Sequence, residues 1–175
     1  GFFKDLIDPL LSRQSFGSQT WVDGRLTAFT TTHIYNSEFP NVTTPNIPQH
    51  LESLKLINNN FTGSIPSWFT MLYSLEKLEI FVNNNITNFE ALSMIPNLYI
   101  IDLVNHTISD NLISTLYLIE NLELHIDDCY SLSESNIDFI GDLTNLSFLS
   151  IRGLDAEIPP EIGNLTNLTS LSIRS

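Results

Sequence analysis

The most restrictive feature of this 175-residue chain is an apolar anchor that recurs at an almost constant step. The anchors, which are separated by 22 to 25 residues, are Phe29, Leu54, Leu78, Ile101, Leu124, Leu149 and Leu171. Self-similarity at this period is the signature of stacked repeats, in which each unit packs only on its neighbours. The chain is therefore expected to form an elongated stack rather than a domain around one central core.

The sequence around most anchors follows the pattern Leu-x-x-Leu-x-Leu, with Ile allowed for Leu. Five segments carry this pattern: 51–56, 75–80, 98–103, 146–151 and 168–173. The last two apolar residues of each segment alternate with other residues, which is typical of a strand with one buried face. Parallel strands from successive units are expected to stack into one sheet, with the chain returning along the outside after each strand.

The fullest repeat lies at residues 51–66, LESLKLINNNFTGSIP, and it resembles the plant-specific type of the leucine-rich-repeat family. Residues 156–168 match the second half of the same pattern. The resemblance implies an α/β solenoid, a right-handed superhelix with one parallel β-sheet on its concave face. It also implies a non-catalytic protein that binds a ligand on that concave face.

Residues 1–25 resemble the amino-terminal cap of such proteins, through Phe3-Lys4, Asp8-Pro9 and Trp21, although the paired cysteines of the family's cap are absent. An apolar stripe near the start suits this segment to covering one end of the stack. Residues 26–175 then hold about six to seven repeats. No matching carboxy-terminal cap is found, so further repeats or another subunit are expected to cover the last unit.

The family usually places an asparagine eight residues after the first leucine, where its amide satisfies buried loop backbone. Asn59 and Asn83 fit this role, and His106 takes the position in the next unit. The following unit, at residues 122–126, is one residue short, which puts Cys129 at the equivalent place. We interpret Cys129 as a buried structural thiol, since free cysteine is most often simply buried.

The charge of the chain restricts the classes of partner that it can bind, and its cysteine content restricts the disulfides that it can form. The formal net charge is −13. The segment from Glu76 to Glu161 contains fifteen acidic residues and only two basic residues, Lys77 and Arg152. Nucleic acid is therefore a poor partner, because phosphate binding needs clustered Lys and Arg. An acidic surface suits basic partners or cations, or is merely a solvated face. The single cysteine excludes an internal disulfide.

Catalytic and cofactor signatures are missing from the sequence. The four histidines have no metal-ligand spacing, and there is no phosphate-binding loop or nucleophile elbow. Carboxylates gather near Asp127, but consecutive strand residues point to opposite faces, which favours a solvated strand end over a cation site. We therefore expect no enzyme, no cofactor and no metal. No apolar run approaches the roughly 20 residues of a transmembrane helix, so no transmembrane segment is expected in this chain.

Seven N-x-S/T sequons point to a eukaryotic secretory pathway and to N-linked glycans. They lie at Asn41, Asn60, Asn85, Asn105, Asn145, Asn164 and Asn167. Asn60 and Asn85 follow strands, where a glycan is easily accommodated, whereas Asn164 and Asn167 are too close together for confident double occupancy. The sequons predict an extracellular or cell-surface location.

Candidate ligand-binding residues are those expected to point outward from the concave face. They are Lys55, Ile57, Glu79, Phe81, Asp102, Val104, His125, Asp127 and Arg152. Ile57, Phe81 and Val104 should form an exposed apolar column on strands about 4.8 Å apart, which Ile100 and Val82 would widen. The alternative is that a loop or a glycan on Asn105 covers this column. Beyond it, charge should change from acidic Asp127 to basic Arg152.

Two functional hypotheses have support in the residues, whereas a third class, a hydrolase inhibitor or an ice-binding solenoid, has no specific residue in its favour. The first is an extracellular, N-glycosylated leucine-rich-repeat domain that recognises a protein or peptide ligand, or mediates adhesion, without catalysis. The second is a structural subunit of a glycosylated extracellular fibre or cell-surface assembly, whose partners are copies of itself. The first predicts dependence on the concave face, whereas the second predicts dependence on the ends of the stack.

Overall fold

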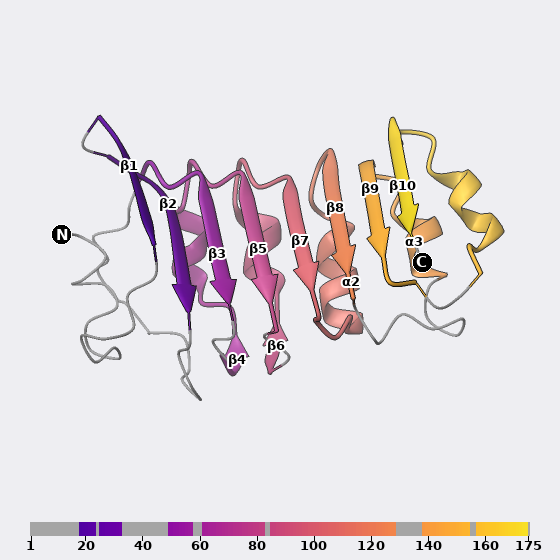
Figure 1. The fold of residues 1–175 in the computed structure, drawn as a ribbon, viewed down its shortest axis with the longest axis horizontal. Coiled ribbons are helices and arrows are strands. Elements are labelled where there is room, and N and C mark those ends of the chain that lie inside the picture. Colours follow the sequence, from indigo (N-terminus) through magenta and orange to yellow (C-terminus); the bar gives the residue numbers. More distant parts are fainter. Residues whose placement is uncertain are drawn as a thin grey trace.

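The computed structural model describes residues 18–23, 25–32, 49–57, 61–82, 85–128, 138–154 and 157–174. Within these residues the main element is a sheet of eight strands in the order β1-β2-β3-β5-β7-β8-β9-β10. The strands lie side by side in chain order along the longest axis, with helical segments behind them (Figure 1). The predicted cap, 1–25, lies mostly outside the described residues, and so do Asn59, Asn83 and Cys129.

The strands of this sheet have the bounds β1 (Gln19–Val22), β2 (Arg25–Thr32), β3 (Ser53–Ile57), β5 (Lys77–Phe81), β7 (Ile100–Val104), β8 (Leu122–Asp127), β9 (Leu146–Arg152) and β10 (Ser170–Arg174). The seven strands from β2 to β10 are parallel to their neighbours. All seven predicted strands are therefore confirmed, together with their parallel arrangement.

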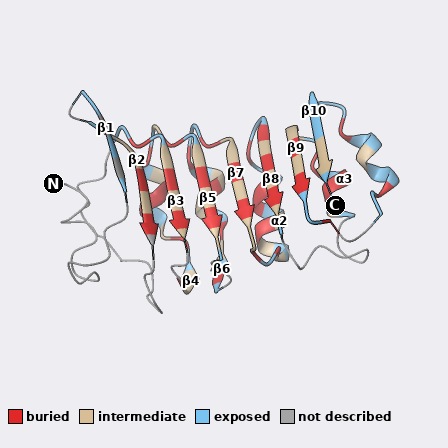
Figure 2. Cartoon of the chain, in the orientation of Figure 1, coloured by how far each residue is buried: buried red, intermediate tan, exposed pale blue. Residues whose placement is uncertain are grey.

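The anchors occupy a single row across the sheet. Phe29 pairs with Leu54, and the pairing continues without a slip through Leu78, Ile101, Leu124 and Leu149 to Leu171. The first six anchors are at most 3% exposed. Because side chains alternate along a strand, this shared register puts the apolar set of every strand on one face. Figure 2 shows the resulting buried band along the strands.

Two expectations about the sheet are wrong. The sheet is not wholly parallel, because β1 runs antiparallel to β2. Val22 pairs with Arg25, so a two-residue connection joins these strands, and only antiparallel strands can be joined so tightly. The anchor Leu171 is 47% exposed instead of buried, since β10 is an edge strand of the described sheet and is covered by a neighbour on one side only.

Short helical segments lie behind the sheet, and a small second sheet lies beyond the ends of β3 and β5 (Figure 1). These elements are β4 (Gly63–Ser64), η1 (Ser67–Met71), β6 (Ile86–Asn88), η2 (Glu90–Met94), α2 (Asp110–Leu116), α3 (Phe139–Asp142) and η3 (Pro160–Asn164), where η denotes a 3₁₀ helix. Helix α2 begins where the Ser109 hydroxyl accepts a hydrogen bond from the Leu112 amide at 3.2 Å, an N-cap that satisfies one terminal donor. Leu112 and Leu116 then pack into the core.

The unit predicted to be one residue short is accommodated by a bulge. Leu122 pairs with Leu146, but Glu123 pairs with Phe148, so Ser147 is the additional residue on β9. A bulge of this kind absorbs one residue and lets the ladder resume in its original register. The Leu124–Leu149 pair is thereby preserved.

Helical segments of successive units approach closely at Gly141. A Cβ atom at this position would lie 2.3 Å from the Glu161 Cβ and 2.8 Å from its backbone carbonyl. Glycine is therefore required where α3 meets η3, because any larger residue would separate the two units.

Truncating a central anchor should destabilise the chain far more than truncating the edge anchor. Ile101 is fully buried, and Ile101→Ala is expected to cost about 2–5 kcal/mol in free energy of unfolding, as other large-to-small core substitutions do. Leu171→Ala is the matched control and should cost much less, because the side chain is already 47% exposed. Urea unfolding followed by circular dichroism measures both. Equal losses would contradict the burial pattern.

Candidate functional site on the open face of the sheet

The sheet side turned away from the helical segments carries partly exposed side chains, and we call it the open face. The pairing of the strands arranges these side chains in three rows. The first row is Ala28, Ser53, Lys77, Ile100, Glu123, Phe148 and Ser170; the second is Thr30, Lys55, Glu79, Asp102, His125, Ser150 and Ser172; the third is Ile57, Phe81, Val104, Asp127, Arg152 and Arg174.

A chain of ion pairs links three strands, β3, β5 and β7, across the open face, and His125 extends it to β8 when its imidazole is protonated. Lys55 Nζ lies 3.3 Å from Glu79 Oε1, and Lys77 Nζ lies 3.5 Å from the same oxygen. Lys77 Nζ also lies 2.8 Å from Asp102 Oδ2. His125 Nε2 is 3.8 Å from Asp102 Oδ1, a buried oxygen that has no hydrogen bond. The predicted residues Lys55, Glu79, Asp102 and His125 are therefore brought together in one network.

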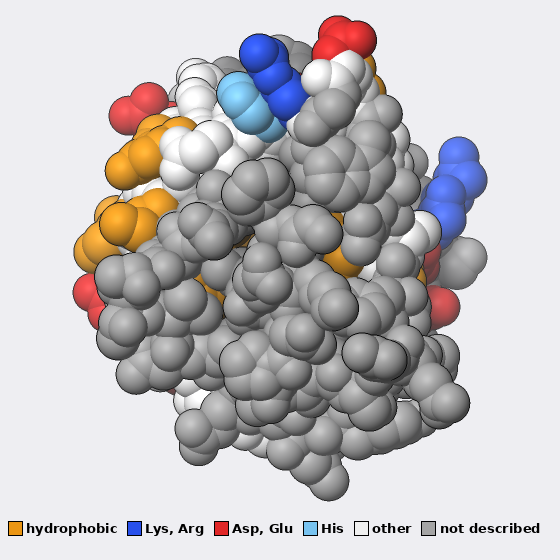
Figure 3. Space-filling model, turned by 90° about the vertical axis from the view of Figure 1, so that its left-hand side faces the viewer, with side chains coloured by type: hydrophobic (Ala, Val, Ile, Leu, Met, Phe, Trp, Pro, Cys, Tyr) orange, Lys and Arg blue, Asp and Glu red, His pale blue; other side chains and the backbone are white. Residues whose placement is uncertain are grey.

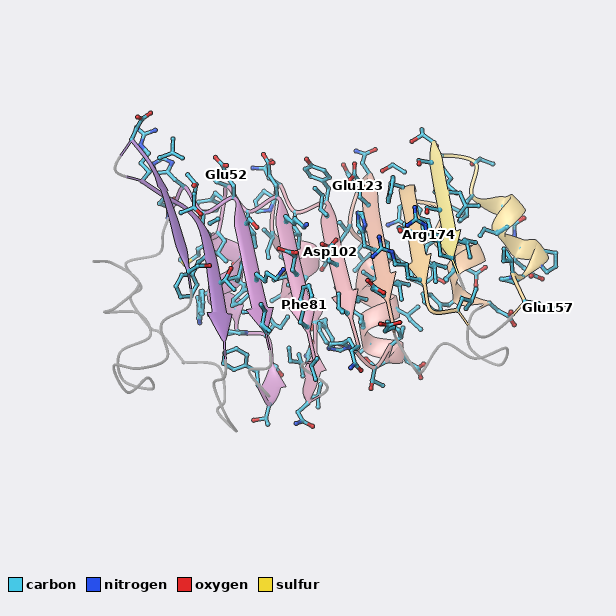
Figure 4. The ribbon with its side chains drawn as sticks, viewed as in Figure 1. Glu52, Phe81, Asp102, Glu123, Glu157 and Arg174 are labelled. Atoms are coloured by element: carbon cyan, nitrogen blue, oxygen red, sulfur yellow. The ribbon has the colours of Figure 1, made fainter. Side chains whose placement is uncertain are left out.

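Lys77 is the centre of this network. Burial alone would lower the pKa of its ammonium group, but the hydrogen bonds and charges of Asp102 and Glu79 outweigh that effect and raise the pKa above its usual value. The ammonium group therefore stays charged throughout the neutral range. Figure 4 shows Asp102 in the middle of the sheet, on β7.

The predicted apolar column is present, but it is less exposed than expected. Ile57, Phe81 and Val104 pair in one row, and each is only partly exposed. The Lys55 ammonium lies 4.2 Å from the centre of the Phe81 ring, a cation–π contact that shields one side of the ring. The reason is the length of the lysine side chain, whose apolar stem covers neighbouring apolar surface. Val82, which was expected to widen the column, is 38% exposed.

The predicted change of charge is partly cancelled within the molecule. Arg152 Nη1 lies 3.4 Å from Asp127 Oδ2, so these two predicted site residues pair with each other on adjacent strands. Further along the same strands, the His125 ring stacks on Phe148 with 4.8 Å between the ring centres. The face therefore continues from the apolar column to an aromatic pair and then to exposed Arg174.

Two residues of this surface, Lys77 and Phe148, were missed by sequence reasoning. Both belong to the first row, directly before the anchor of their strand. The same alternation that places Lys55 and Ile57 on the open face also places this position there. The signal was therefore in the sequence, but apart from Ile100 the candidate residues of this face were chosen from the positions after each anchor.

A residue with left-handed backbone follows each of four strands. The φ angles are 52° at Val82, 49° at Asn105, 49° at Asp128 and 68° at Gly153. Each amide donates a hydrogen bond to the carbonyl at the end of the next strand, as from Val82 to Val104 at 3.0 Å. Asn, Asp and Gly tolerate this conformation, whereas a β-branched residue is strained in it. Val82 is therefore the exception, and it lies directly beside Phe81.

The predicted glycan acceptors differ in geometry. Asn41 and Asn60 lie outside the described residues. Asn85 and Asn164 are exposed, which suits attachment of a glycan, and Asn105 is partly exposed. Asn167 is exposed, but its Nδ2 donates to the Thr144 carbonyl at 2.8 Å.

Asn145 is poorly placed as an acceptor, contrary to the prediction that included it. Its Nδ2 donates two hydrogen bonds of 2.7 Å, to the carbonyls of Leu116 and Ile119. Asn97, which lies two units before Asn145, makes the corresponding contact: its side-chain amide donates to the Tyr73 carbonyl. The asparagine before the first leucine of a unit thus connects that unit to the preceding one by hydrogen bonds. A glycan on the Asn145 side-chain nitrogen would displace these hydrogen bonds.

His106 is buried, at 3% exposure, as its predicted structural role requires. Its Nδ1 lies 2.7 Å from the Thr107 carbonyl, and its ring meets Phe89 edge-on with 5.7 Å between centres. Among the described residues, no group of three or more His, Cys, Asp or Glu side chains is arranged to hold a metal ion. No helix in that part of the chain is long and apolar enough to cross a membrane.

No protein-family model matches the chain, and no curated protein matches it in sequence.

Exchanging the residue types at two equivalent left-handed positions should have opposite effects. Val82→Asn is expected to stabilise the fold by about 1 kcal/mol, because it relieves the left-handed strain of a β-branched residue. The reciprocal change, Asn105→Val, should destabilise by about 1–2 kcal/mol for the same reason. Chemical denaturation measures both. A destabilised Val82→Asn would show that its backbone is not strained.

Two of the asparagines that precede a first leucine, Asn145 and Asn167, provide a second test. Asn145→Ala should cost about 1–3 kcal/mol of stability, because two partly buried carbonyls lose their donor. Asn167→Ala, at the same place in the next unit, should cost less because it is exposed and makes one such bond. Peptide mass spectrometry of protein from a secretory host should find Asn145 unmodified. A glycan on Asn145 would contradict its structural role.

Proposed function

We propose that this chain is a leucine-rich-repeat solenoid domain of an extracellular or cell-surface glycoprotein, and that it recognises a protein or peptide without catalysis. The observation that carries the proposal is the unbroken row of anchors, which aligns the Leu-x-x-Leu-x-Leu segments strand by strand. A right-handed superhelix with the open face on its concave side is part of this proposal.

The open face supports a peptide-like ligand with both apolar and charged groups. Its apolar row, Ile57, Phe81 and Val104, lies beside the ion pairs of Lys55 and Glu79. Interfaces commonly combine an aromatic or apolar centre with a polar rim. An apolar ligand side chain would pack on Phe81, while charged ligand groups would exchange with the existing pairs.

Val82 adds a physical argument for contact at this place. Strained backbone persists where the surroundings compensate for it, and it clusters at functional sites. Three of four equivalent positions hold a residue suited to the left-handed conformation, whereas the fourth holds an exposed valine next to Phe81. A ligand that covers Val82 and Phe81 would provide a reason for this choice.

The second candidate function is a structural subunit that assembles with its own copies. The observation in its favour is edge strand β10, where Leu171 is 47% exposed and Ile173 is partly buried. An edge strand presents unpaired backbone groups that another strand can join. In this case the contacts would lie at the end of the sheet, and the open face would be dispensable.

The test compares Phe81→Ala with two matched variants. Peptides selected by phage display against the protein should bind Phe81→Ala more weakly by about 1–3 kcal/mol, because a central anchor is lost. Tyr73→Ala removes an aromatic side chain that is 50% exposed away from the open face, and it should leave affinity unchanged. Leu171→Asp, at the edge strand, should also leave affinity unchanged. Calorimetry supplies the affinities.

Electron microscopy of the same samples distinguishes the recognition function from the structural-subunit function. The recognition proposal expects short monodisperse particles for all variants. The recognition proposal would be contradicted if filaments persisted in Phe81→Ala but disappeared in Leu171→Asp, and if Phe81→Ala also retained peptide binding. These results would favour the structural-subunit function.

A further inference from the structure

A second surface lies at the edge of the sheet where the strands begin, and of the three rows of the open face it includes only Glu123. Here an open groove of about 690 Å³ separates the turn after η2 from the turn after α2. Its volume falls within the range of about 300–1,000 Å³ that is common for ligand sites. Glu123 marks this edge in Figure 4, above the start of β8.

The groove contains the two most exposed large hydrophobic side chains of the described residues. Met94 is 58% exposed and Leu118 is 65% exposed, and both line the groove. They occupy corresponding places in successive units, four residues before the first leucine; Met94 is the last residue of η2, and Leu118 lies shortly after α2. Exposed apolar side chains that line one groove mark a contact surface, and methionine adapts to varied partners. The view from the β1 end shows hydrophobic side chains on one flank of the whole molecule, with Asp or Glu beside them, without distinguishing the residues of the groove (Figure 3).

The rim of the groove is acidic and lacks a compensating base. Glu76, Glu120 and Glu123 line it, whereas none of the described lining residues is Lys or Arg. These three carboxylates also form no ion pair with any other described residue. By contrast, Glu79 and Asp102 on the open face are paired with lysines. The charge at the groove is thus available to a partner.

We propose that this groove binds a basic, apolar peptide segment of a partner protein, one in which leucine-like side chains alternate with Lys or Arg. The apolar side chains pack on Met94 and Leu118, and the cations meet Glu76, Glu120 and Glu123. Charge complementarity selects the partner, because an acidic segment would place like charges against the rim. A single metal ion would leave the apolar part of the groove unused.

The probe is a fluorescent, end-blocked hexapeptide of alternating lysine and leucine, and its binding is followed by anisotropy. Two control peptides replace leucine by serine or lysine by glutamate. The first retains the charge without apolar contact, and the second retains the apolar contact with reversed charge. Both controls should bind much more weakly than the probe if the groove uses both properties.

Paired variants locate the site. Glu120→Lys and Leu118→Asp should each weaken probe binding by about fivefold or more, the loss typical of removing an important interface contact. Glu157→Lys and Ile158→Asp make the same changes at exposed residues that do not line the groove, and they should leave affinity unchanged. Circular dichroism checks that each variant keeps its fold, which is expected because all four side chains are exposed.

Three results would overturn the proposal. The first is absence of probe binding at millimolar concentration. The second is equal binding of the lysine–serine peptide, or equal weakening by Glu157→Lys, since both would indicate attraction by the overall charge of −13. The third is loss of probe binding in Phe81→Ala with full binding in Glu120→Lys, which would assign the peptide to the open face.

Discussion

Burial of one apolar anchor per strand against its equivalent in the next strand is the constraint on which the rest of the molecule depends. In a sheet, a slip of one residue moves every side chain to the opposite face. The row from Phe29 to Leu171 therefore fixes more than the core. It also sets which residues, more than twenty positions apart in sequence, become neighbours about 4.8 Å apart on the open face. The ion pairs Lys55–Glu79 and Lys77–Asp102, each between adjacent strands, follow from that register.

Hydrogen bonds between successive units add to the apolar packing that holds the units together. The left-handed residues after β5, β7, β8 and β9 donate their backbone amides to the next strand, and Asn97, Asn145 and Asn167 donate their side-chain amides to the preceding unit. Backbone groups at the turns must be satisfied wherever water is excluded. These ladders explain why polar residues recur at fixed places in the repeat. They also explain why a sequon in such a place is a weak indication of a glycan.

The strands, their parallel order and the buried anchors could be predicted because each follows from periodicity alone. The short pair β4–β6 could not, because very short strands leave no periodic signal. Antiparallel β1 leaves no repeat signal either, but Asp23-Gly24 between β1 and β2 is a sequence signal for a two-residue hairpin that was overlooked. On the open face, periodicity predicted which residues share a row. Periodicity did not predict that Lys55 would cover Phe81 or that Arg152 would pair with Asp127. Long side chains have many rotamers, and the local charges determine which of them is adopted.

The open face and the groove differ in how their charges are balanced, and this difference separates the kinds of ligand that each can select. On the open face Lys77 already holds Glu79 and Asp102, so a charged ligand gains only the difference between new and existing pairs. Selection there must come mainly from shape and from packing on Phe81. At the groove, Glu76, Glu120 and Glu123 face no base within the described residues, so a cationic ligand displaces no internal partner. The excess of acidic residues in the sequence thus acts locally, at the edge where the strands begin.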